Sequence, residues 1–371
     1  MASSFRVKVD HVRHRLNFRF EAGTSRGVLK TKDTYYVRVS SDSFSGVFGY
    51  GEAGPLPKLS IDDLPDFEER LARICRKVSE IPVPLSEPEI LEWVTCHVPE
   101  ELPSVRFALE VALLDLVQGG KKRIMENEFY DRGAPLAING LIWMGSSDFM
   151  LGQIRQKLAD GYTCIKMKIG SIDFEQEYAL LADIRKHYTA DQVVLRVDAN
   201  GAFSVIEARE KLRRLGELDI HSIEQPIRQG QRKAMSDLAK DSPVPIALDE
   251  ELIGIFGSKE KERLLDEVQP QYIILKPSLV GGIQATQEWI RVAEERGIGW
   301  WMTSALESNI GLNAIAQLTS TYCPTVPQGL GTGQLYHNNI ASPLTVDAGR
   351  IFYNCDGSWG NIAGLFGAVS P

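Results

Sequence analysis

Hydrophobic residues in the centre of the chain come in short runs, and each run ends on a charged side chain. Within residues 162–278 these side chains are Lys168, Asp198, Glu224, Asp249 and Lys276. They lie 25 to 30 residues apart, and each interval holds one stretch with the spacing of an amphipathic helix. A strand, a helix and two loops occupy about this length. The pattern therefore predicts a repeated strand–helix unit with a charge at the carboxyl end of each strand.

The repeat extends in both directions from this segment. The further predicted elements are strands at 136–143 and 162–168 with a helix at 147–160, and strands at 300–304 and 328–333 with a helix at 309–319. This makes eight units, the number that closes a parallel barrel. The carboxyl ends of the strands meet at one face of such a barrel, where the chemistry is found.

The first part of the chain has strands followed by helices. Residues 5–20 alternate apolar with polar side chains, which predicts a half-exposed strand, and 35–39 and 46–52 predict two more. Between Ile61 and Gln118 the spacing is helical, most clearly at 104–116. Strands followed by helices are typical of an α+β domain.

We therefore predict two domains: an α+β domain at residues 1–130 and a barrel at 131–339. Residues 21–27 are small and polar and predict a mobile loop. The C-terminal segment, about 340–371, is predicted to return to the first domain, with strand pattern at 344–353.

The composition narrows the class of partner. A net charge of −8 and a pI near 5.4 argue against nucleic acid or an anionic membrane. Five scattered cysteines without a Cys-x-x-Cys pair fit reduced thiols, and no run approaches the roughly 18 apolar residues of a membrane span. We expect a cytoplasmic protein that acts on a small molecule. The sequence leaves the oligomeric state open, a homo-oligomer included.

Three lysines form the first group of candidate catalytic residues. Residues i and i+2 of a strand share a face, so Lys166 and Lys168 project to one side. Inside a barrel, neighbouring ammonium groups repel and lose solvation, and both effects would lower a lysine pKa toward the range of a general base. Lys276 approaches from the sixth strand, opposite the second. Taken alone, the first two lysines would be interpreted as a solvated surface pair.

Three carboxylates form the second group. Asp198, Glu224 and Asp249 come from consecutive strand ends. Hard oxygen ligands without His or Cys suit Mg²⁺, or Mn²⁺ in its place, and three converging carboxylates would repel one another without a cation. Asn200 shares a face with Asp198, so we expect it near a metal-bound water or the substrate. Glu250 points to the other side of a regular strand and is expected to have a supporting role.

These motifs resemble those of the enolase superfamily, specifically its muconate lactonizing enzyme subgroup. The matching segments are Lys166-x-Lys168, Asp198-Ala-Asn200-Gly, Glu224-Gln-Pro, Asp249-Glu250, Lys276-Pro and, in the first domain, residues 51–57. The resemblance implies an α+β capping domain whose loop at 21–27 closes over substrate, and a modified TIM barrel, (β/α)₇β. It also implies Mg²⁺ on the three carboxylates and proton abstraction α to a bound carboxylate, which gives an enediolate.

The eighth predicted strand separates the families of this subgroup. Dipeptide epimerases carry an Asp-x-Asp there for the substrate's ammonium group, whereas this chain has Gly329-Leu-Gly331. Glycine-rich backbone offers N–H donors to an anionic tail instead. This segment and residues 303–311, with Ser304 and Glu307 as candidate substrate contacts or supporting residues, resemble the o-succinylbenzoate synthase family.

That resemblance implies the syn-dehydration of 2-succinyl-6-hydroxy-2,4-cyclohexadiene-1-carboxylate in menaquinone biosynthesis. Lys168 would be the base, Lys276 would stabilise the intermediate from the opposite face, and Lys166 would tune Lys168. Three alternatives stay open: a racemase or epimerase that uses Lys168 and Lys276 as opposed acid/base groups, a pyridoxal phosphate enzyme with a Schiff-base lysine, and a non-catalytic binding protein.

Overall fold

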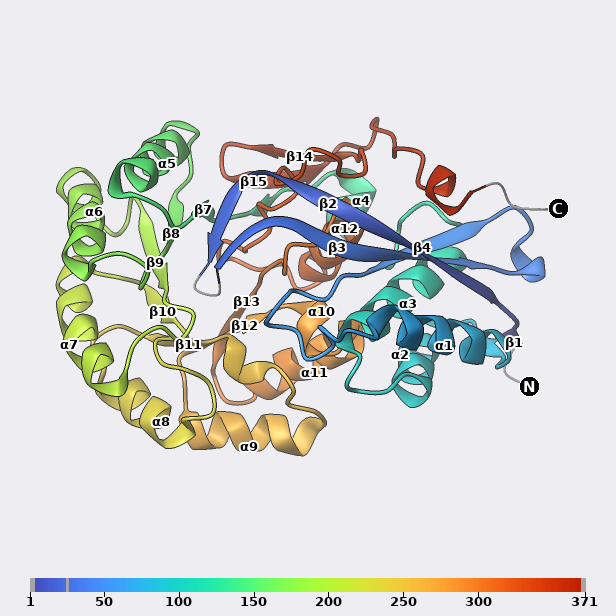
Figure 1. Ribbon diagram of the computed structural model, residues 1–371, viewed down its shortest axis with the longest axis horizontal. Helices are drawn as coiled ribbons and strands as arrows, with labels where there is room; N and C mark the ends of the chain where they lie inside the picture. Colours follow the sequence, from blue (N-terminus) through green and yellow to red (C-terminus); the bar gives the residue numbers. More distant parts are fainter. Residues whose placement is uncertain (1–3, 25–26, 368–371) are drawn as a thin grey trace.

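A curled, parallel, seven-stranded sheet forms the centre of the molecule (Figure 1). The computed structural model describes residues 4–24 and 27–367. The strands, in spatial and chain order, are β7 (Gly140–Ile142), β8 (Cys164–Lys168), β9 (Val194–Asp198), β10 (Ser222–Glu224), β11 (Ile246–Leu248), β12 (Tyr272–Leu275) and β13 (Gly299–Met302). The predicted charged residues all lie at or directly after the carboxyl ends of their strands, so the predicted barrel is confirmed.

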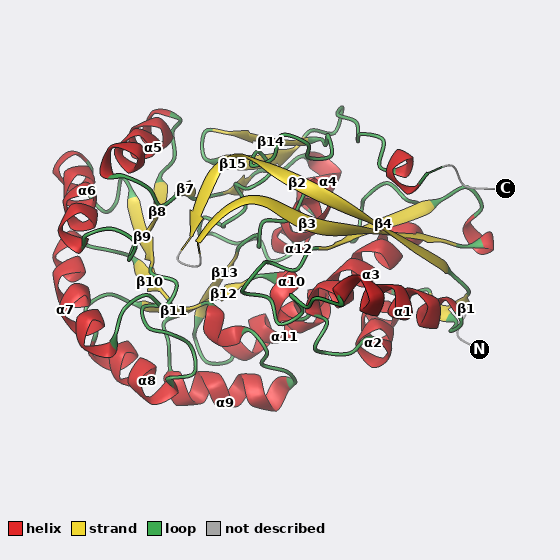
Figure 2. Ribbon diagram, viewed as in Figure 1, coloured by secondary structure: helices red, strands yellow, loops and turns green. Residues whose placement is uncertain are grey.

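Helices follow the strands in turn and cover the outside of the sheet. They are α5 (Ser147–Ala159), α6 (Phe174–His187), α7 (Val205–Leu215), α8 (Arg232–Asp241), α9 (Ser258–Val268), the short α10 (Pro277–Val280), α11 (Gly282–Glu294) and α12 (Asn309–Ser320). Figure 2 shows α5 to α9 as an outer arc around the strands. Among the described residues, no helix is both long enough and apolar enough to cross a membrane.

The barrel wall is irregular at its first and eighth positions. The predicted strand at 136–143 is divided, because β6 (Leu136–Ala137) pairs with β15 (Arg350–Tyr353) and only β7 joins the parallel sheet. At the eighth position Gln328 and Gly329 form single parallel bridges to Ile138 and Thr303 in place of a regular strand. A Cβ atom on Gly329 would lie 2.4 Å from Thr303 Oγ1, so glycine allows the close approach that closes the wall.

The N-terminal region consists of an antiparallel sheet packed on helices. Its strands are β2 (Lys8–Thr24), β3 (Gly27–Ser40) and β4 (Phe48–Ala53), and its helices are α1 (Phe67–Ser79), α2 (Glu87–His97) and α3 (Pro103–Val117). A short pair, β1 (Ser4–Phe5) and β5 (Val83–Pro84), lies beside them. The predicted strands and the 104–116 helix are confirmed.

The predicted loop at 21–27 is largely wrong. Residues up to Thr24 continue β2 and Gly27 begins β3, while positions 25–26 lie outside the described residues. Pairing between the two strands resumes at Ala22 and Leu29 after an irregularity, so tertiary pairing overrides the small polar composition. This hairpin reaches the barrel, where Gly23 bridges to Met144 and Phe18 to Tyr336.

The C-terminal segment forms strands, as predicted, but their partner differs from the one expected. The hairpin of β14 (Leu344–Asp347) and β15 pairs with β6 and not with the β2–β4 sheet. The chain contacts the first region on both sides of this hairpin: Asn338 Oδ1 accepts from the Asn17 N–H at 2.8 Å, and Ile340 and Ile362 pack in one cluster with Tyr36 and Tyr50.

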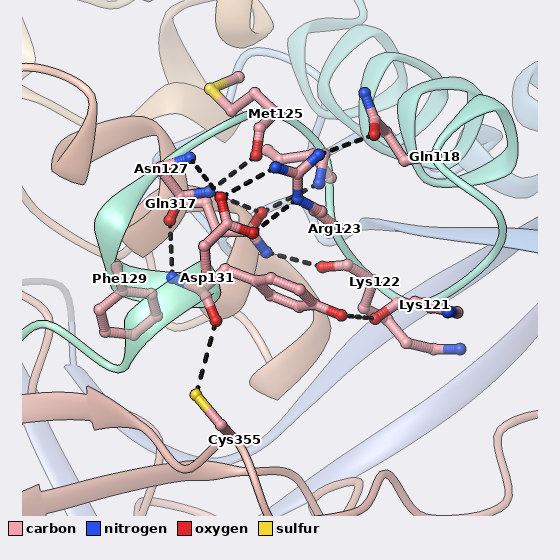
Figure 3. Close-up of polar contacts among 12 residues, drawn as sticks. Gln118, Lys121, Lys122, Arg123, Met125, Asn127, Phe129, Asp131, Gln317 and Cys355 are labelled. Carbon is pink, nitrogen blue, oxygen red and sulfur yellow. Dashed lines mark hydrogen bonds and ion pairs between the residues drawn. The ribbon is translucent and has the colours of Figure 1, made fainter.

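The segment between α3 and α4 (Glu128–Arg132) is held against the barrel by α12 (Figure 3). Gln317 of α12 donates to the Lys122 carbonyl at 2.6 Å and accepts from the Ile124 N–H at 2.9 Å. Arg123 and Asp131 form an ion pair at 2.8 Å across the same turn. These bonds fix the place where the chain passes from the first region to the barrel.

Candidate active site

A cavity of about 430 Å³ opens at the carboxyl ends of the strands. Phe20 of the β2–β3 hairpin and Leu56, after β4, line it from the N-terminal region. Of the predicted site residues, its lining includes Lys166, Lys168, Asp198, Asn200, Lys276, Ser304, Gly329 and Gly331. Three of the five charged strand ends, Lys168, Asp198 and Lys276, therefore face one cavity, whereas Glu224 and Asp249 are not among its lining residues.

Lys166 lies between two carboxylates. Its ammonium group donates to Glu224 Oε2 and lies 3.1 Å from Asp198 Oδ2. All three residues are buried, with 4% or less of their surface exposed. Parallel pairing of β8 with β9, and of β9 with β10, brings these residues together from three strands.

Lys168 has a different set of partners. Its ammonium group donates to Asp198 Oδ2 at 3.0 Å and to Asn200 Oδ1 at 2.7 Å. Asn200 has a positive φ of 44° and donates from its amide to Glu250 Oε1 at 3.0 Å. Glu250 thus acts on Lys168 through Asn200, which is the supporting position that the sequence predicted.

Lys276 faces the same cavity from β12, four strands away from β8. Its ammonium group donates to Asp249 Oδ2. The Asp249 backbone N–H in turn donates to Gln225 Oε1 at 3.2 Å. Two lysines, Lys168 and Lys276, can therefore approach a substrate from opposite strands.

The carboxylates decide the charge state of the buried lysines. Burial alone would lower the pKa of Lys166, but attraction to Asp198, Glu224 and Asp249 outweighs it, and the pKa is raised. Burial likewise opposes a raised pKa of Lys276, where Asp249 is the strongest attraction. The predicted lowering of a lysine pKa is therefore wrong for Lys166.

The pKa values of the two buried acids Glu224 and Asp198 shift in opposite directions. Burial raises the pKa of Glu224 to about 7, with Asp198 and Asp249 adding to the rise and Lys166 opposing it. Burial also disfavours ionised Asp198, but the three lysines outweigh it and hold the pKa of Asp198 well below its usual range.

The predicted metal site is not assembled. In residues 4–24 and 27–367, no three Asp, Glu, His or Cys side chains stand in an arrangement that could hold a metal ion. The physical reason is that each carboxylate bonds to a lysine. The donor set still fits a hard divalent cation: the three carboxylates are buried, and Glu224 Oε1 has no hydrogen-bond partner in this part of the chain.

Ser304 and Glu307 occupy different places. Ser304 lines the cavity, whereas fully buried Glu307 lies behind it and accepts from Ser304 Oγ at 2.6 Å and from the Ala305 N–H at 2.7 Å. Glu307 also accepts from Ser278 Oγ, two residues after Lys276. Of its two proposed roles, the geometry favours the supporting one.

Sequence reasoning missed several residues of the cavity. Those that carry a polar group are Asn139, Gln153, Lys157, Tyr162, Thr303, Thr332 and Gln334. Gln153 and Lys157 lie on α5, where an amphipathic spacing gives no sign that a polar residue faces inward. The others lie in segments whose irregular backbone the repeat did not predict.

Comparison with known proteins agrees with this geometry. The sequence model of the family described as "Enolase C-terminal domain-like" matches residues 150–354. The chain is 47% identical to an o-succinylbenzoate synthase of Desulfotalea psychrophila, over 93% of this chain and 98% of that protein. A crystal structure of MenC from Desulfotalea psychrophila superimposes with a TM-score of 0.83 at 42% identity, covering 94% of this chain and all of that one.

A more distant structure shares the fold alone. The L-Ala-D/L-Glu epimerase of Bacillus subtilis, in a complex with substrate, gives a TM-score of 0.80 at 20% identity, with 95% of this chain and 96% of that chain covered. The family match and the 47% identity carry the assignment. This chain is similar to the o-succinylbenzoate synthases. It is therefore an enzyme of the enolase superfamily, in the muconate lactonizing enzyme subgroup.

Proposed function

We propose that this enzyme is an o-succinylbenzoate synthase, which removes water from 2-succinyl-6-hydroxy-2,4-cyclohexadiene-1-carboxylate to give 2-succinylbenzoate. The observation that carries the proposal is the charge of the cavity. Among the described residues that line it, four are lysines and one is a carboxylate, Asp198. Such a cavity suits a substrate with two carboxylates, and the 47% identity to an o-succinylbenzoate synthase supports the same choice.

Lys168 is the proposed base. In its neutral form it takes the proton from the carbon next to the ring carboxylate. As an ammonium group it then gives a proton to the departing hydroxyl on the same face, so water leaves and the ring becomes aromatic. The bonds to Asp198 and Asn200 at 3.0 and 2.7 Å hold its amino group in place for both transfers.

The other lysines act through their charge. Lys276 faces the cavity from the opposite side and is placed to stabilise the negative charge that develops when the proton leaves. Lys166 keeps Asp198 and Glu224 together. Members of the superfamily use Mg²⁺, for which Asp198, Glu224 and Asp249 are the proposed ligands; when bound, it supplies positive charge that neutralises the substrate carboxylate.

A racemase or epimerase is the second candidate. Lys168 and Lys276 both line the cavity from distant strands, which is the arrangement that proton removal on one face and return on the other requires. A dipeptide with a free ammonium group is disfavoured, because residues 328–336 contain no Asp or Glu to pair with it. An N-acylated amino acid has no such group.

One pair of assays tests the proposal. Loss of the cyclohexadiene is followed by ultraviolet absorbance with and without Mg²⁺, and exchange of α-protons into dipeptides and N-succinylamino acids is followed in D₂O. We expect fast Mg²⁺-dependent loss of the diene without exchange. Exchange without dehydration would transfer the function to a racemase or epimerase.

The base is tested by substitution. Lys168→Ala should abolish dehydration and leave the thermal midpoint unchanged within a few degrees, whereas Lys259→Ala, at an exposed position on α9, should behave as wild type. Turnover by Lys168→Ala near the wild-type rate would refute the assignment. A place in menaquinone biosynthesis and a cytoplasmic location follow from the same proposal.

A further inference from the structure

One lysine of the cavity has no acidic partner. Lys166, Lys168 and Lys276 each bond to Asp198, Glu224 or Asp249. The ammonium group of the fourth, Lys157 of α5, makes no hydrogen bond or ion pair with any residue in the described part of the chain, although this residue lines the same cavity. Its charge is therefore available to a ligand.

The position of Lys157 is fixed by its stem and by an aromatic ring. Its ammonium group lies 4.6 Å from the centre of the Tyr162 ring. Its Cγ and Cδ atoms lie over Gly140, where a Cβ atom would approach them to 3.1 Å. Burial lowers the pKa of Lys157, and exposed Asp160 opposes this only in part. Nothing in this setting neutralises the charge by direct contact.

The cavity reaches α5 beside the irregular part of the barrel wall. Gly331 packs against Ile138 and the Asn139 carbonyl, within 3.7 Å of where its Cβ would be. Three buried polar atoms without a hydrogen-bond partner among the described residues belong to cavity-lining side chains: Asn139 Oδ1, Thr303 Oγ1 and Thr332 Oγ1. Buried polar atoms are seldom left unpaired, so they indicate a polar ligand group on this side.

We propose that Lys157 is a specificity-determining residue that binds the second carboxylate of a dianionic substrate, with the three unpaired polar atoms lining the path of its tail. This inference rests on the proposed function and deepens it, since the tail of the proposed substrate ends in a carboxylate. In this proposal the first carboxylate binds among the strand-end lysines, Lys166, Lys168 and Lys276. Lys157 thereby distinguishes diacids from substrates with a neutral tail.

A purely structural role for Lys157 predicts something different. If its ammonium group served only the contact with Tyr162, its loss would change stability and leave ligand preference unaltered. Lys157→Met keeps the stem over Gly140 and removes the charge. Lys157→Arg keeps the charge. Arg155→Met removes one charge from an exposed position of the same helix, and so controls for the long-range electrostatic effect of losing a positive charge.

Steady-state kinetics with the cyclohexadiene give the first readout. Lys157→Met should raise KM about 10- to 100-fold, the range for a lost bond to a charged group, with a smaller effect on kcat. Lys157→Arg and Arg155→Met should stay within about threefold of wild type in KM, the scatter expected of substitutions that keep the bond. An unchanged KM in Lys157→Met would overturn the proposal.

Binding gives a readout that does not need turnover. The probes are 2-succinylbenzoate and its analogue with a primary amide in place of the tail carboxylate, titrated calorimetrically in the presence of Mg²⁺. Wild type and Lys157→Arg should prefer the diacid, and Lys157→Met should bind both compounds alike. A retained preference in Lys157→Met would refute the subsite. Failure of wild type to dehydrate the diene would instead refute the proposed function, so the two failures are distinguishable.

Discussion

Glu52 of β4 joins the N-terminal region to the barrel through three hydrogen bonds, and a fourth bond holds it to Thr34 of its own region. Its fully buried carboxylate accepts from Thr34 Oγ1 at 2.8 Å, from the Ser308 N–H at 2.8 Å, from Ser308 Oγ at 2.6 Å and from the Gly311 N–H at 2.9 Å. Ser308 is the N-cap of α12, so a carboxylate from one region satisfies the helix terminus of the other. We predict that this link is a major contribution to stability.

The magnitude of this stabilisation follows from the hydrogen-bond donors that a substitution of Glu52 would leave without an acceptor. Glu52→Ala leaves the backbone N–H groups of Ser308 and Gly311 buried without an acceptor, and each such donor costs about 1–3 kcal/mol. The expected loss in the free energy of unfolding is about 4 kcal/mol. Glu52→Gln keeps one acceptor oxygen and should lose about half of that.

Urea unfolding followed by tryptophan fluorescence and far-ultraviolet circular dichroism measures both losses. Glu92→Ala is the matched control, because Glu92 is exposed on α2 and its side chain makes no hydrogen bond among the described residues. Its change should stay within about 0.5 kcal/mol. A loss below about 1 kcal/mol for Glu52→Ala would contradict the reasoning, since it would mean that water or a rearranged loop satisfies both donors.

Three further predictions concern pH, metal and glycine. Burial raises the pKa of Glu110 from 4.5 to about 8. The contribution of the protonated Glu110 to the free energy of unfolding is therefore full below about pH 4.5 and is lost as the pH rises toward 8. In urea unfolding between pH 5 and 8, Glu110→Gln should flatten this decline in the free energy of unfolding. Mg²⁺ should raise the thermal midpoint of wild type and not of Asp249→Asn, and an equal rise in both would exclude Asp249 as a ligand. Gly152→Ala, on the exposed face of α5 with free space around it, should stabilise by about 0.5–1 kcal/mol, whereas Gly329→Ala should destabilise because its Cβ would meet Thr303.

The strand-end charges could be predicted because parallel strands place their carboxyl ends at one face whatever the details of the loops. A period of 25 to 30 residues was sufficient to bring Lys168, Asp198 and Lys276 to one cavity. The lysine pKa was not predictable from the Lys166–Lys168 pair alone. The direction of the pKa shift depends on the distances from each ammonium group to carboxylates of neighbouring strands. The sequence does not give these distances.

The link through Glu52 illustrates a second limit. Its partner Ser308 lies 256 positions away, and no periodicity connects a β4 carboxylate with the N-terminus of α12. The β2–β3 hairpin shows the same limit at short range, since the composition of 21–27 favours a loop and the pairing partner extends the strand. Both depend on contacts between regions that were predicted separately.

Lys157 shows why substrate specificity could not be predicted from the strand–helix repeat. In a regular barrel the helices lie outside the wall and do not contact substrate, so the strand-end argument assigns chemistry only to residues at the carboxyl ends. Here the eighth position has two single bridges in place of a strand, and α5 contributes lining residues to the cavity beside it. The regular strands thus carry the lysines and acids of the proposed chemistry, whereas the irregular wall admits other side chains to the cavity. We therefore expect exchanges of substrate tail within this subgroup to depend on α5 and residues 328–335 more than on the strand ends.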